Sequence, residues 1–322
     1  MIYYPWQKNQ WEKLSRQFLQ HQLPHALLLT GIKGLGKFQF AKKFSQFILC
    51  SSPRENQSCG VCRNCHLFET NNHPDFFPIQ SEENNNIKID QIRTLITDLM
   101  QTPKCSAYQV VLIEPADSMN TASFNSLLKT LEEPLGNVIF LLVSSRAEKL
   151  PLTILSRCQK INFYADESFE TLQWLAQYIS DEEEAKLFLH AACGAPLKVL
   201  QLQDENYIHT RDEFFKYISD EHLSVLKAAQ VFSALPAEII LDYFYTWCLD
   251  IFKLQLKTNT QFITYADKIA DLKIQAEKIS TDALKKFLIY LSEAKALQLS
   301  NLHLNPQLFF EDLFFRWASL FS

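Results

Sequence analysis

Hydrophobic residues in the first half of the chain gather in short continuous runs that are separated by segments with helical spacing. The runs are residues 26–30, 75–79, 109–113, 138–144 and 159–164. Runs that are apolar throughout, rather than at alternate positions, are typical of parallel strands covered on both faces. The pattern therefore predicts an α/β domain in which helices cover a mostly parallel sheet.

The clearest helical stripe lies between the third and fourth of these runs. It consists of Phe124, Leu127, Leu128 and Leu131. Residues at i, i+3, i+4 and i+7 share one face of a helix, so we expect this segment to bury that face. Pro134 ends the stripe, because proline lacks the N–H that a helix interior needs.

After residue 164 the strand pattern disappears and only helical spacing remains. Residues 166–202 show two or three short helical segments, which are interrupted at Gly194 and Pro196. Longer helical segments follow from residue 204. We therefore predict an α/β domain at residues 1–165, a small helical domain at 166–203 and a larger helical domain at 204–322.

The last predicted helix has a recognisable start. Asn305 is a favourable N-cap residue, and the fixed backbone angle of Pro306 suits the first helical turn. The residues expected on one face of this helix are Leu308, Phe309, Leu313 and Trp317.

The overall composition excludes several classes of protein. The chain is 47% hydrophobic over 322 residues, which is too apolar for intrinsic disorder. No apolar run approaches the roughly 20 residues that a membrane-spanning helix needs. The first residues lack the basic and apolar regions of a signal peptide, so we expect a cytoplasmic protein with no membrane partner. A formal charge of −5 argues against a free-standing nucleic-acid binder held by bulk charge.

Three of the six glycines lie directly after the first predicted strand. Gly31, Gly34 and Gly36, followed by Lys37, form a G-x-x-x-x-G-K motif that precedes a helical segment. In this context backbone N–H groups and a helix N-terminus hold phosphates. The next position usually carries a Ser or Thr that helps to hold Mg²⁺, but here it is Phe38. The sequence thus predicts a phosphate loop without its metal ligand, and leaves open whether ATP binds.

The end of the third predicted strand is altered as well. An active ATPase usually places there an Asp, followed by a Glu that orients the attacking water. These positions hold Glu114 and Pro115, and proline cannot act as a base. We therefore favour a nucleotide-binding fold kept as architecture. The alternative is an ATP-hydrolysing enzyme that uses Asp117 or Glu114 with Mg²⁺.

Half of the eight cysteines fall within sixteen positions. They are Cys50, Cys59, Cys62 and Cys65. Four thiolates at these spacings can close a tetrahedral Zn²⁺ site, with Gly60 providing the turn between ligands. A redox-active pair is the alternative, but the third and fourth cysteines favour a metal. Because a closed site has no open coordination position, we expect a structural role for it.

The remaining chemistry near this cluster has simpler interpretations. We expect His66 and His73 to be surface histidines, since four thiolates already complete the site. Cys105, Cys193 and Cys248 are expected to be buried small apolar residues. A zinc-bearing nucleic-acid-binding module is a further alternative, and the weakest, because the cysteine-rich segment holds only one arginine, Arg63.

Arg157 lies in the sequence Ser-Arg-Cys, directly before the fifth predicted strand. At the end of a helix, an arginine can simply satisfy the helix dipole, and spacing alone favours this interpretation. The other possibility is an arginine finger that reaches a nucleotide on a neighbouring subunit.

The run FNSLLKTLEEP at residues 124–134, the four spaced cysteines and Ser-Arg-Cys at 156–158 together resemble the clamp-loader branch of the AAA+ family. The likeness covers essentially the whole chain. It implies a RecA-like AAA+ domain with a zinc module at about residues 50–66, then a helical lid domain and a helical collar domain for subunit association. The implied partners are motor subunits of the gamma/tau type and a delta-type subunit. Through that complex they include the sliding clamp and primed DNA.

The resemblance also implies roles for single residues. Arg157 falls on the position of the family's arginine finger, which reverses the preference from spacing. Leu197, with Lys198 beside it, stands where motor subunits have a nucleotide-sensing arginine. Ser144 and Ser145 stand where the family has a polar sensor. The resemblance therefore implies a rigid, non-hydrolysing stator that acts in DNA replication through its neighbours.

Overall fold

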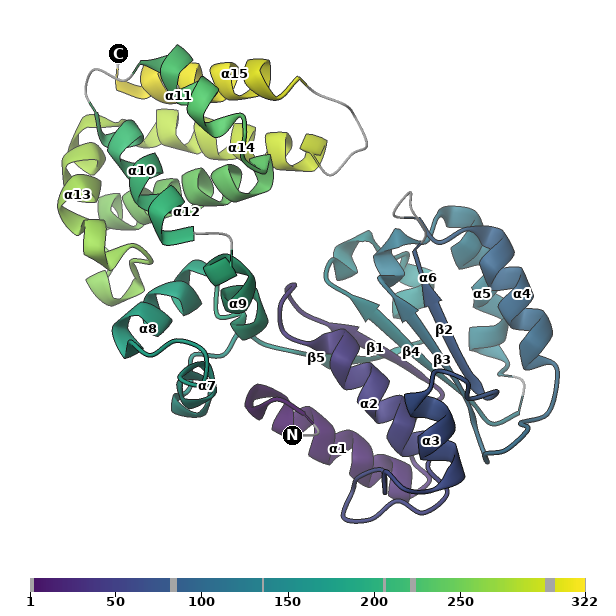
Figure 1. Ribbon diagram of the computed structural model, residues 1–322. Helices are drawn as coiled ribbons and strands as arrows, with labels where there is room; N and C mark the ends of the chain where they lie inside the picture. The colour runs from purple at the N-terminus through teal and green to yellow at the C-terminus, as the bar shows by residue number, and fades with distance from the viewer. Residues whose placement is uncertain are drawn as a thin grey trace. The chain divides into compact units, whose positions relative to one another are not determined.

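The computed structural model describes residues 3–81, 86–134, 136–204, 207–220, 224–298 and 305–321. The chain forms two compact units, Met1–Leu200 and Gln201–Ser322 (Figure 1). The α/β core and the helical segments predicted for 166–203, as far as Leu200, lie within the first unit. The further division of that unit into an α/β domain and a lid domain stays a prediction.

The first unit is built on a five-stranded parallel sheet with the strand order β2-β3-β4-β1-β5. The strands are β1 (Ala26–Thr30), β2 (Phe76–Gln80), β3 (Gln109–Glu114), β4 (Val138–Ser144) and β5 (Gln159–Asn162). The predicted parallel sheet is therefore confirmed. The strand β2 is displaced by one residue from its predicted run, and β5 ends two residues earlier than expected.

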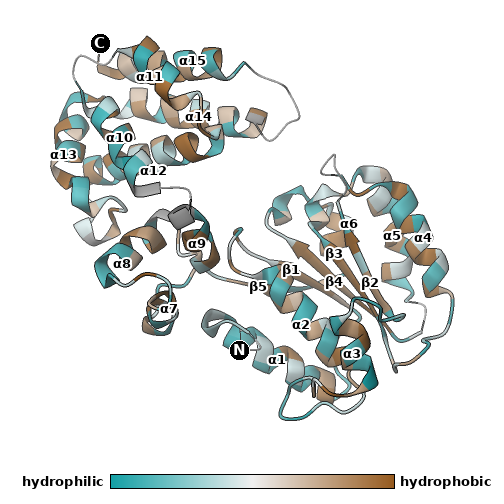
Figure 2. Cartoon of the chain, viewed as in Figure 1, coloured by the Kyte–Doolittle hydropathy of each residue, from teal (hydrophilic) through white to brown (hydrophobic). Residues whose placement is uncertain are grey.

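Helices cover both faces of this sheet, and its three central strands, β1, β3 and β4, are buried along nearly their whole length (Figures 1 and 2). The helices around it are α1 (Lys8–Leu19), α2 (Lys37–Leu49), α3 (Arg63–Glu69), α4 (Ile89–Leu99), α5 (Thr121–Glu132) and α6 (Leu152–Leu155). Leu27 and Leu29 of β1 pack with α1 and α2, whereas Leu28 packs with α4 and α5. Alternate side chains of one strand thus fill two cores.

The stripe predicted for residues 124–131 lies on α5 as expected. Phe124, Leu127 and Leu131 are buried, and Leu128 is partly buried against the same core. Asn120 caps the helix, because its side chain accepts a hydrogen bond of 2.8 Å from the backbone N–H of Ser123.

The predicted helical segments after residue 165 are also confirmed. They are α7 (Phe169–Leu175), α8 (Glu182–Ala191) and α9 (Pro196–Asp204). Asp181 caps α8 through its side chain, and the turn before α9 contains Gly194. Among the helices in the described ranges, none is both long enough and apolar enough to cross a membrane.

The second unit is helical in the part of it that the structure describes. Its helices are α10 (Tyr207–Ser219), α11 (Val225–Phe232), α12 (Ala237–Gln255), α13 (Ile269–Lys278), α14 (Thr281–Gln298) and α15 (Pro306–Ala318). Its core is aromatic, with Phe214 edge-on to Phe244 at 4.7 Å between ring centroids and Trp247 hydrogen-bonded to Gln275 at 2.7 Å. Buried tryptophan requires such a partner for its N–H.

The helix α15 begins at the predicted cap, but its predicted face is wrong in part. Leu308 is 63% exposed, whereas the buried side chains are Phe310, Leu313, Phe314 and Trp317. Apolar residues surround most of this helix, so two faces had nearly equal hydrophobicity in the sequence. Only packing against α11 and neighbouring aromatic rings selects between them.

Candidate functional site

The phosphate-loop residues lie at the carboxyl edge of the sheet, where three neighbouring strands end. The loop from Gly31 to Gly36 follows β1, Glu114 ends β3, and Ser144 ends β4. Because β3, β4 and β1 are adjacent and parallel, their carboxyl ends meet at one place. This is where an open α/β sheet ordinarily binds a ligand, and the chain brings the predicted loop and strand residues together there.

Lys37 is buried at this edge and is held by its own chain. Its ammonium group donates hydrogen bonds to the carbonyl oxygens of Gly31 at 2.7 Å and Ile32 at 2.8 Å, and to the hydroxyl of Ser145 at 3.0 Å. Three acceptors match the three N–H bonds of an ammonium group. Burial lowers the pKa of Lys37 to about 8, while the nearby Glu114 and Asp117 oppose that shift.

The N-terminal segment covers the second half of the loop. The short 3₁₀ helix η1 (Pro5–Gln7) places Gln7 so that its amide donates to the carbonyl oxygens of Leu35 and Gly36, at 2.8 and 3.0 Å. The indole N–H of Trp6 donates to the same Leu35 oxygen at 3.0 Å. Gly36 has a φ of +75°, and a Cβ there would lie 2.8 Å from the ring of Tyr4.

The start of α9 covers the loop from the other side. The backbone N–H of Leu197 donates to the carbonyl oxygen of Gly34 at 3.1 Å. A Cβ on Gly34 would lie 2.8 Å from the Cβ of Lys198 and 3.0 Å from its backbone nitrogen. The structure therefore places Leu197 and Lys198, which the resemblance aligns with a nucleotide-sensing arginine, beside the loop, where they lie against its backbone.

Asp117 is held by residues at the end of β4. Its Oδ1 accepts from the hydroxyl of Ser144 at 2.7 Å and its Oδ2 accepts from Nε of Arg146 at 3.0 Å. The Asp117 side chain is 3% exposed. Both oxygens thus serve internal bonds, which leaves little coordinating capacity for Mg²⁺. Burial raises the pKa of Glu114, and Lys37 opposes that rise.

Arg157 lies two residues beyond the end of α6 and is partly exposed. One terminal nitrogen donates to the carbonyl oxygen of Thr153 at 2.8 Å and to the hydroxyl of Ser156 at 3.3 Å. The other forms an ion pair with Glu132 at the end of α5. Its Nε is buried and makes no hydrogen bond to any residue that the structure describes. The contact with Thr153 agrees with the helix-terminus interpretation, and the exposed fraction of 31% leaves the side chain reachable.

Lys37 and Arg157 lie at opposite edges of the same sheet. The phosphate loop follows β1, whereas Arg157 precedes β5, and β5 is paired in parallel with β1 so that Leu27 lies opposite Gln159. Strands rise about 3.3 Å per residue, so the five residues of β1 separate the two edges by roughly 13 Å. Arg157 therefore cannot serve the phosphate loop of its own chain.

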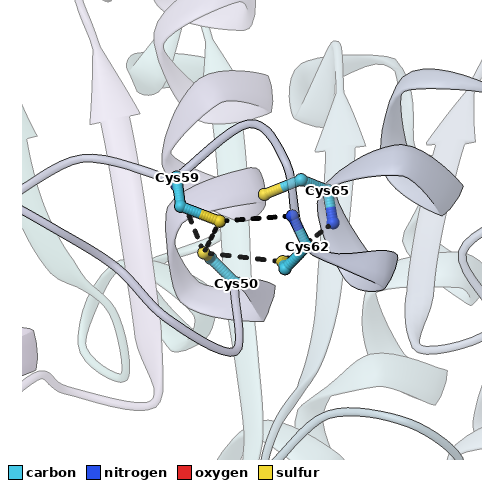
Figure 3. A group of neighbouring side chains, drawn as sticks. All are labelled: Cys50, Cys59, Cys62 and Cys65. Atoms are coloured by element: carbon cyan, nitrogen blue, oxygen red, sulfur yellow. Dashed lines mark hydrogen bonds between the residues drawn. The ribbon is translucent and has the colours of Figure 1, made fainter.

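The four clustered cysteines converge on one point between the end of α2 and the start of α3 (Figure 3). All four sulfur atoms lie within 4.8 Å of one another. The Cys50 sulfur is 3.6 Å from that of Cys59 and 3.9 Å from that of Cys62. A tetrahedron with metal–sulfur bonds of about 2.3 Å has edges of about 3.8 Å. The cluster therefore fits a four-thiolate metal site.

Backbone groups around the cluster favour thiolates at Cys59 and Cys62, whereas burial raises the pKa of Cys50 and Cys65. The N–H of Cys62 donates to the Cys59 sulfur, and the N–H of Cys65 donates to the Cys62 sulfur, each at 3.4 Å. Cys62 also caps the N-terminus of α3, where negative charge is stabilised. Burial would raise the pKa of Cys62, but hydrogen bonds from Ser51 and Cys65 outweigh it and lower that pKa to about 5. Gly60 has a φ of +71°, as its predicted turn requires.

Two long-range bonds anchor this module to the rest of the unit. The indole of Trp11 on α1 donates to the carbonyl oxygen of Asn56 at 3.0 Å. The buried amide of Asn64 donates to the carbonyl oxygens of Leu49 and Cys105, at 2.9 and 3.1 Å. Sequence reasoning missed both anchors, because a buried Trp or Asn has no pattern that reveals its partner.

Two of the simpler predictions near the module are wrong. His73 is 5% exposed rather than on the surface, and its Nδ1 accepts the backbone N–H of Asp75 at 3.2 Å. Cys193 is exposed, because it lies in the turn after α8 with a φ of +55°. Cys105 is half-buried, with its sulfur 3.8 Å from Nε2 of His73, whereas Cys248 is buried as expected. His66 is exposed as expected.

His73, Asp75 and Cys105 form a second cluster of groups that can bind metals. The carboxylate of Asp75 already accepts the backbone N–H groups of Lys104, Cys105 and Ser106 at 2.6 to 2.9 Å. These bonds lower the pKa of Asp75 although burial opposes them. The cluster is therefore explained as a support for the turn before β3.

Comparison with known protein families gives a consistent result over both units. The sequence profile of the family described as "DNA polymerase III, delta subunit" matches residues 6–167. The profile described as "DNA polymerase III, delta subunit, C terminal" matches residues 205–319. Together they cover the α/β core and most of the helical second unit.

Individual relatives carry related names. The chain is 32% identical over 323 residues to DNA polymerase III subunit delta' of Pseudomonas aeruginosa, and the match covers 98% of each chain. It is 30% identical over 210 residues to the subunit of the same name from Escherichia coli, covering 64% of this chain and 63% of that one. It is 34% identical over 169 residues to DNA polymerase III subunit tau/gamma of Haemophilus influenzae, covering 52% and 24% respectively.

Proposed function

Because the chain belongs to the DNA polymerase III delta subunit family, with delta' subunits among its relatives, we propose that it is the non-hydrolysing stator of a clamp loader. Family membership confirms the resemblance that the sequence motifs carry. In the proposed role the chain associates with motor subunits of the gamma/tau type and a delta-type subunit. The complex as a whole would act on the sliding clamp and primed DNA.

The observation that carries the non-hydrolysing role is the state of Lys37. All three of its N–H bonds are directed at oxygens of its own chain, so binding a phosphate would require it to abandon them. The missing hydroxyl at Phe38, the proline at Pro115 and the engaged Asp117 support the same proposal. The contacts of Gln7 and Lys198 with the loop argue further that it serves packing rather than ATP binding.

Arg157 supports the second half of the proposal, an arginine finger supplied in trans. It lies at the amino edge of the sheet, away from its own loop, and its side chain is 31% exposed. An arginine that stabilises the charge of a transferring phosphoryl group accelerates the reaction by about 10³- to 10⁵-fold. A subunit can therefore affect hydrolysis strongly without hydrolysing ATP itself.

The four-cysteine module is proposed to hold one structural Zn²⁺. Cys50, Cys59, Cys62 and Cys65 would bind it as thiolates, and the metal would link the end of α2 to the start of α3. The separations between sulfur atoms support this assignment. With four protein ligands the site has no position for a substrate, so we assign it no catalytic step.

Reconstitution tests this function directly. The chain is mixed with candidate motor and delta-type subunits, and the ATPase rate of the complex is measured with the wild-type chain and with Arg157→Ala. We expect the variant to assemble normally and to lose the rate at the motor site that adjoins this chain. Undiminished activity of an intact variant complex would exclude the arginine finger.

The purified chain alone distinguishes the alternative enzyme. We expect no Mg²⁺-dependent turnover of ATP by the isolated chain. Turnover that Lys37→Ala abolishes would instead establish an ATP-hydrolysing subunit, and would contradict the inference from the bonds of Lys37.

A further inference from the structure

Arg157 and Glu132, which form an ion pair, lie 25 residues apart in the sequence. Glu132 is the last residue of α5 and its side chain is 47% exposed. A carboxylate at a helix C-terminus is unfavourable, because the carbonyl end of the helix dipole is negative. The guanidinium of Arg157 offsets this charge, so the pairing is a feature that the local electrostatics favour.

The same contact reduces the ability of Arg157 to donate hydrogen bonds to a phosphate. Of its two terminal nitrogens, one is occupied by the Thr153 carbonyl and the Ser156 hydroxyl, and the other by Glu132. The guanidinium is therefore neutralised by its own subunit before any neighbour is present. A phosphate group from a neighbouring subunit would have to compete with the Glu132 carboxylate for the positive charge of this guanidinium.

The paired conformation is also incompletely satisfied. Nε of Arg157 is buried and has no hydrogen-bond partner within the described part of the chain. An unpaired buried donor is unfavourable, so a conformation that gives Nε an acceptor would be preferred once such an acceptor arrives. Phosphate oxygens accept forked pairs of hydrogen bonds from guanidinium groups. The observed arrangement thus suits a resting state that a phosphate can displace.

We propose that Glu132 is a positioning residue that parks Arg157 on its own subunit until the phosphate of a neighbouring nucleotide displaces it. The inference rests on the proposed function of Arg157 and adds a second residue to it. Exposed ion pairs are weak, and both partners here are partly exposed, so the parked state opens readily. Glu132 then sets how much ATP the neighbouring site needs before Arg157 engages.

The test uses the reconstituted complex with Glu132→Gln, which removes the charge and keeps the shape of the side chain. We expect the KM for ATP to fall about two- to fivefold with little change in kcat, because parking opposes engagement and not the engaged state. The difference should shrink at high salt, since the pair is accessible to ions. Glu133→Gln is the matched control. It makes the same charge change at the neighbouring exposed residue, whose side chain forms no ion pair with Arg157 in the described structure.

Two further results separate this inference from the proposed function. In an Arg157→Ala background, Glu132→Gln should have no additional effect, since nothing remains to be parked. In the isolated chain, Glu132→Gln should speed the exchange of the Arg157 Nε proton with solvent, measured by NMR. If Arg157→Ala leaves the ATPase of the complex unchanged, the proposed function fails. If that variant is defective but Glu132→Gln behaves like Glu133→Gln, or raises the KM, only the parking role is overturned.

Discussion

The chain carries two cations of the kind that bind phosphate, Lys37 at the carboxyl edge of the sheet and Arg157 at the amino edge. Lys37 is 5% exposed, and its ammonium group donates to three oxygens of the same chain. The Arg157 side chain is 31% exposed, and its Nε has no hydrogen-bond partner among the described residues. One cation is satisfied internally, whereas the other keeps capacity for an external acceptor.

This difference shows that a phosphate-loop motif in the sequence is not by itself a nucleotide-binding site. The glycines and lysine of a phosphate loop are present, but their backbone carbonyl groups now accept bonds from Trp6, Gln7 and Lys37. Glycine remains necessary at Gly34 because α9 contacts it closely. In the structure the motif takes part in packing, so its presence in the sequence does not establish nucleotide binding. The arginine, which no motif of that strength marks, carries the proposed chemistry.

The largest difference should appear when Arg157 and Lys37 are each replaced by alanine in the reconstituted complex. Arg157→Ala should lower the rate at the adjoining motor site by roughly 10³- to 10⁵-fold, because the transition-state charge loses a guanidinium. Lys37→Ala should leave the ATPase of the complex within about twofold, since its bonds are internal. Single-turnover hydrolysis measures both. A comparable loss in the two variants would abolish the distinction between them.

The comparison depends on an intact first unit, which removal of the metal should destabilise. We expect about one Zn²⁺ per purified chain and none in Cys59→Ser/Cys62→Ser. At a free zinc concentration of a thousand times the Kd, the unfolding free energy of the metal-free variant should be about 4 kcal/mol lower than that of the zinc-bound wild type. Metal analysis and denaturant melts measure this, with the exposed Cys193→Ser as control. A stable, metal-free wild-type chain would contradict the assignment.

The burial of Lys37 predicts a dependence of stability on pH. The pKa of Lys37 is about 8 in the folded chain and 10.5 in the unfolded one. Between these values the unfolded chain holds a proton that the folded chain has released, so stability rises with pH. Relative to Lys37→Met, the wild type should gain up to about 3 kcal/mol from pH 8 to 10.5, with no change below pH 8.

Denaturant melts at a series of pH values measure this difference. Lys43→Met is the control, because Lys43 is an exposed lysine on the same helix. A wild-type chain that gains no stability relative to Lys37→Met over this range would show that Lys37 is solvated, and would weaken the contrast with Arg157.

The smallest effect concerns the closure of the phosphate loop. Gly34→Ala should destabilise the first unit by about 1–2 kcal/mol more than Gly136→Ala, because only the former places a Cβ against Lys198. Both glycines have positive φ values, +89° and +71°, so backbone strain is matched. Equal losses of melting temperature would show that α9 does not press on the loop in solution.

Sequence reasoning captured the features that depend on neighbouring residues. Apolar runs revealed the strands of the parallel sheet, and the spacing of the cysteines revealed their convergence on one point. The side-chain partners of Lys37 and Arg157 could not be predicted from the sequence. Ser145 lies 108 residues from Lys37, and Glu132 lies 25 residues from Arg157. Such pairs are set by sheet order and helix packing, and a surface carboxylate such as Glu132 looks like any other in the sequence.

The same limit explains the errors. His73 was expected on the surface, because four thiolates already complete the metal site. The Asp75 carboxylate, which fixes the turn before β3 beside this histidine, is not recognisable in the sequence as a support. The buried face of α15 was misjudged at Leu308, because the helix offers two apolar faces. Position in a turn, rather than residue type, decided the exposure of Cys193.

Lys37 lies at the carboxyl ends of the strands and Arg157 at their amino ends, so the two sides of the subunit are chemically different. In the proposed function, a protein that offers a cation at one edge and holds a nucleotide at the other can pass activation along a row of copies, each completing the next. In this chain the loop at the receiving edge is contacted by the chain's own residues, Gln7 on one side and Leu197 on the other. In the proposed function the chain would therefore donate to a neighbour without accepting from one, and it would stand at one end of the row.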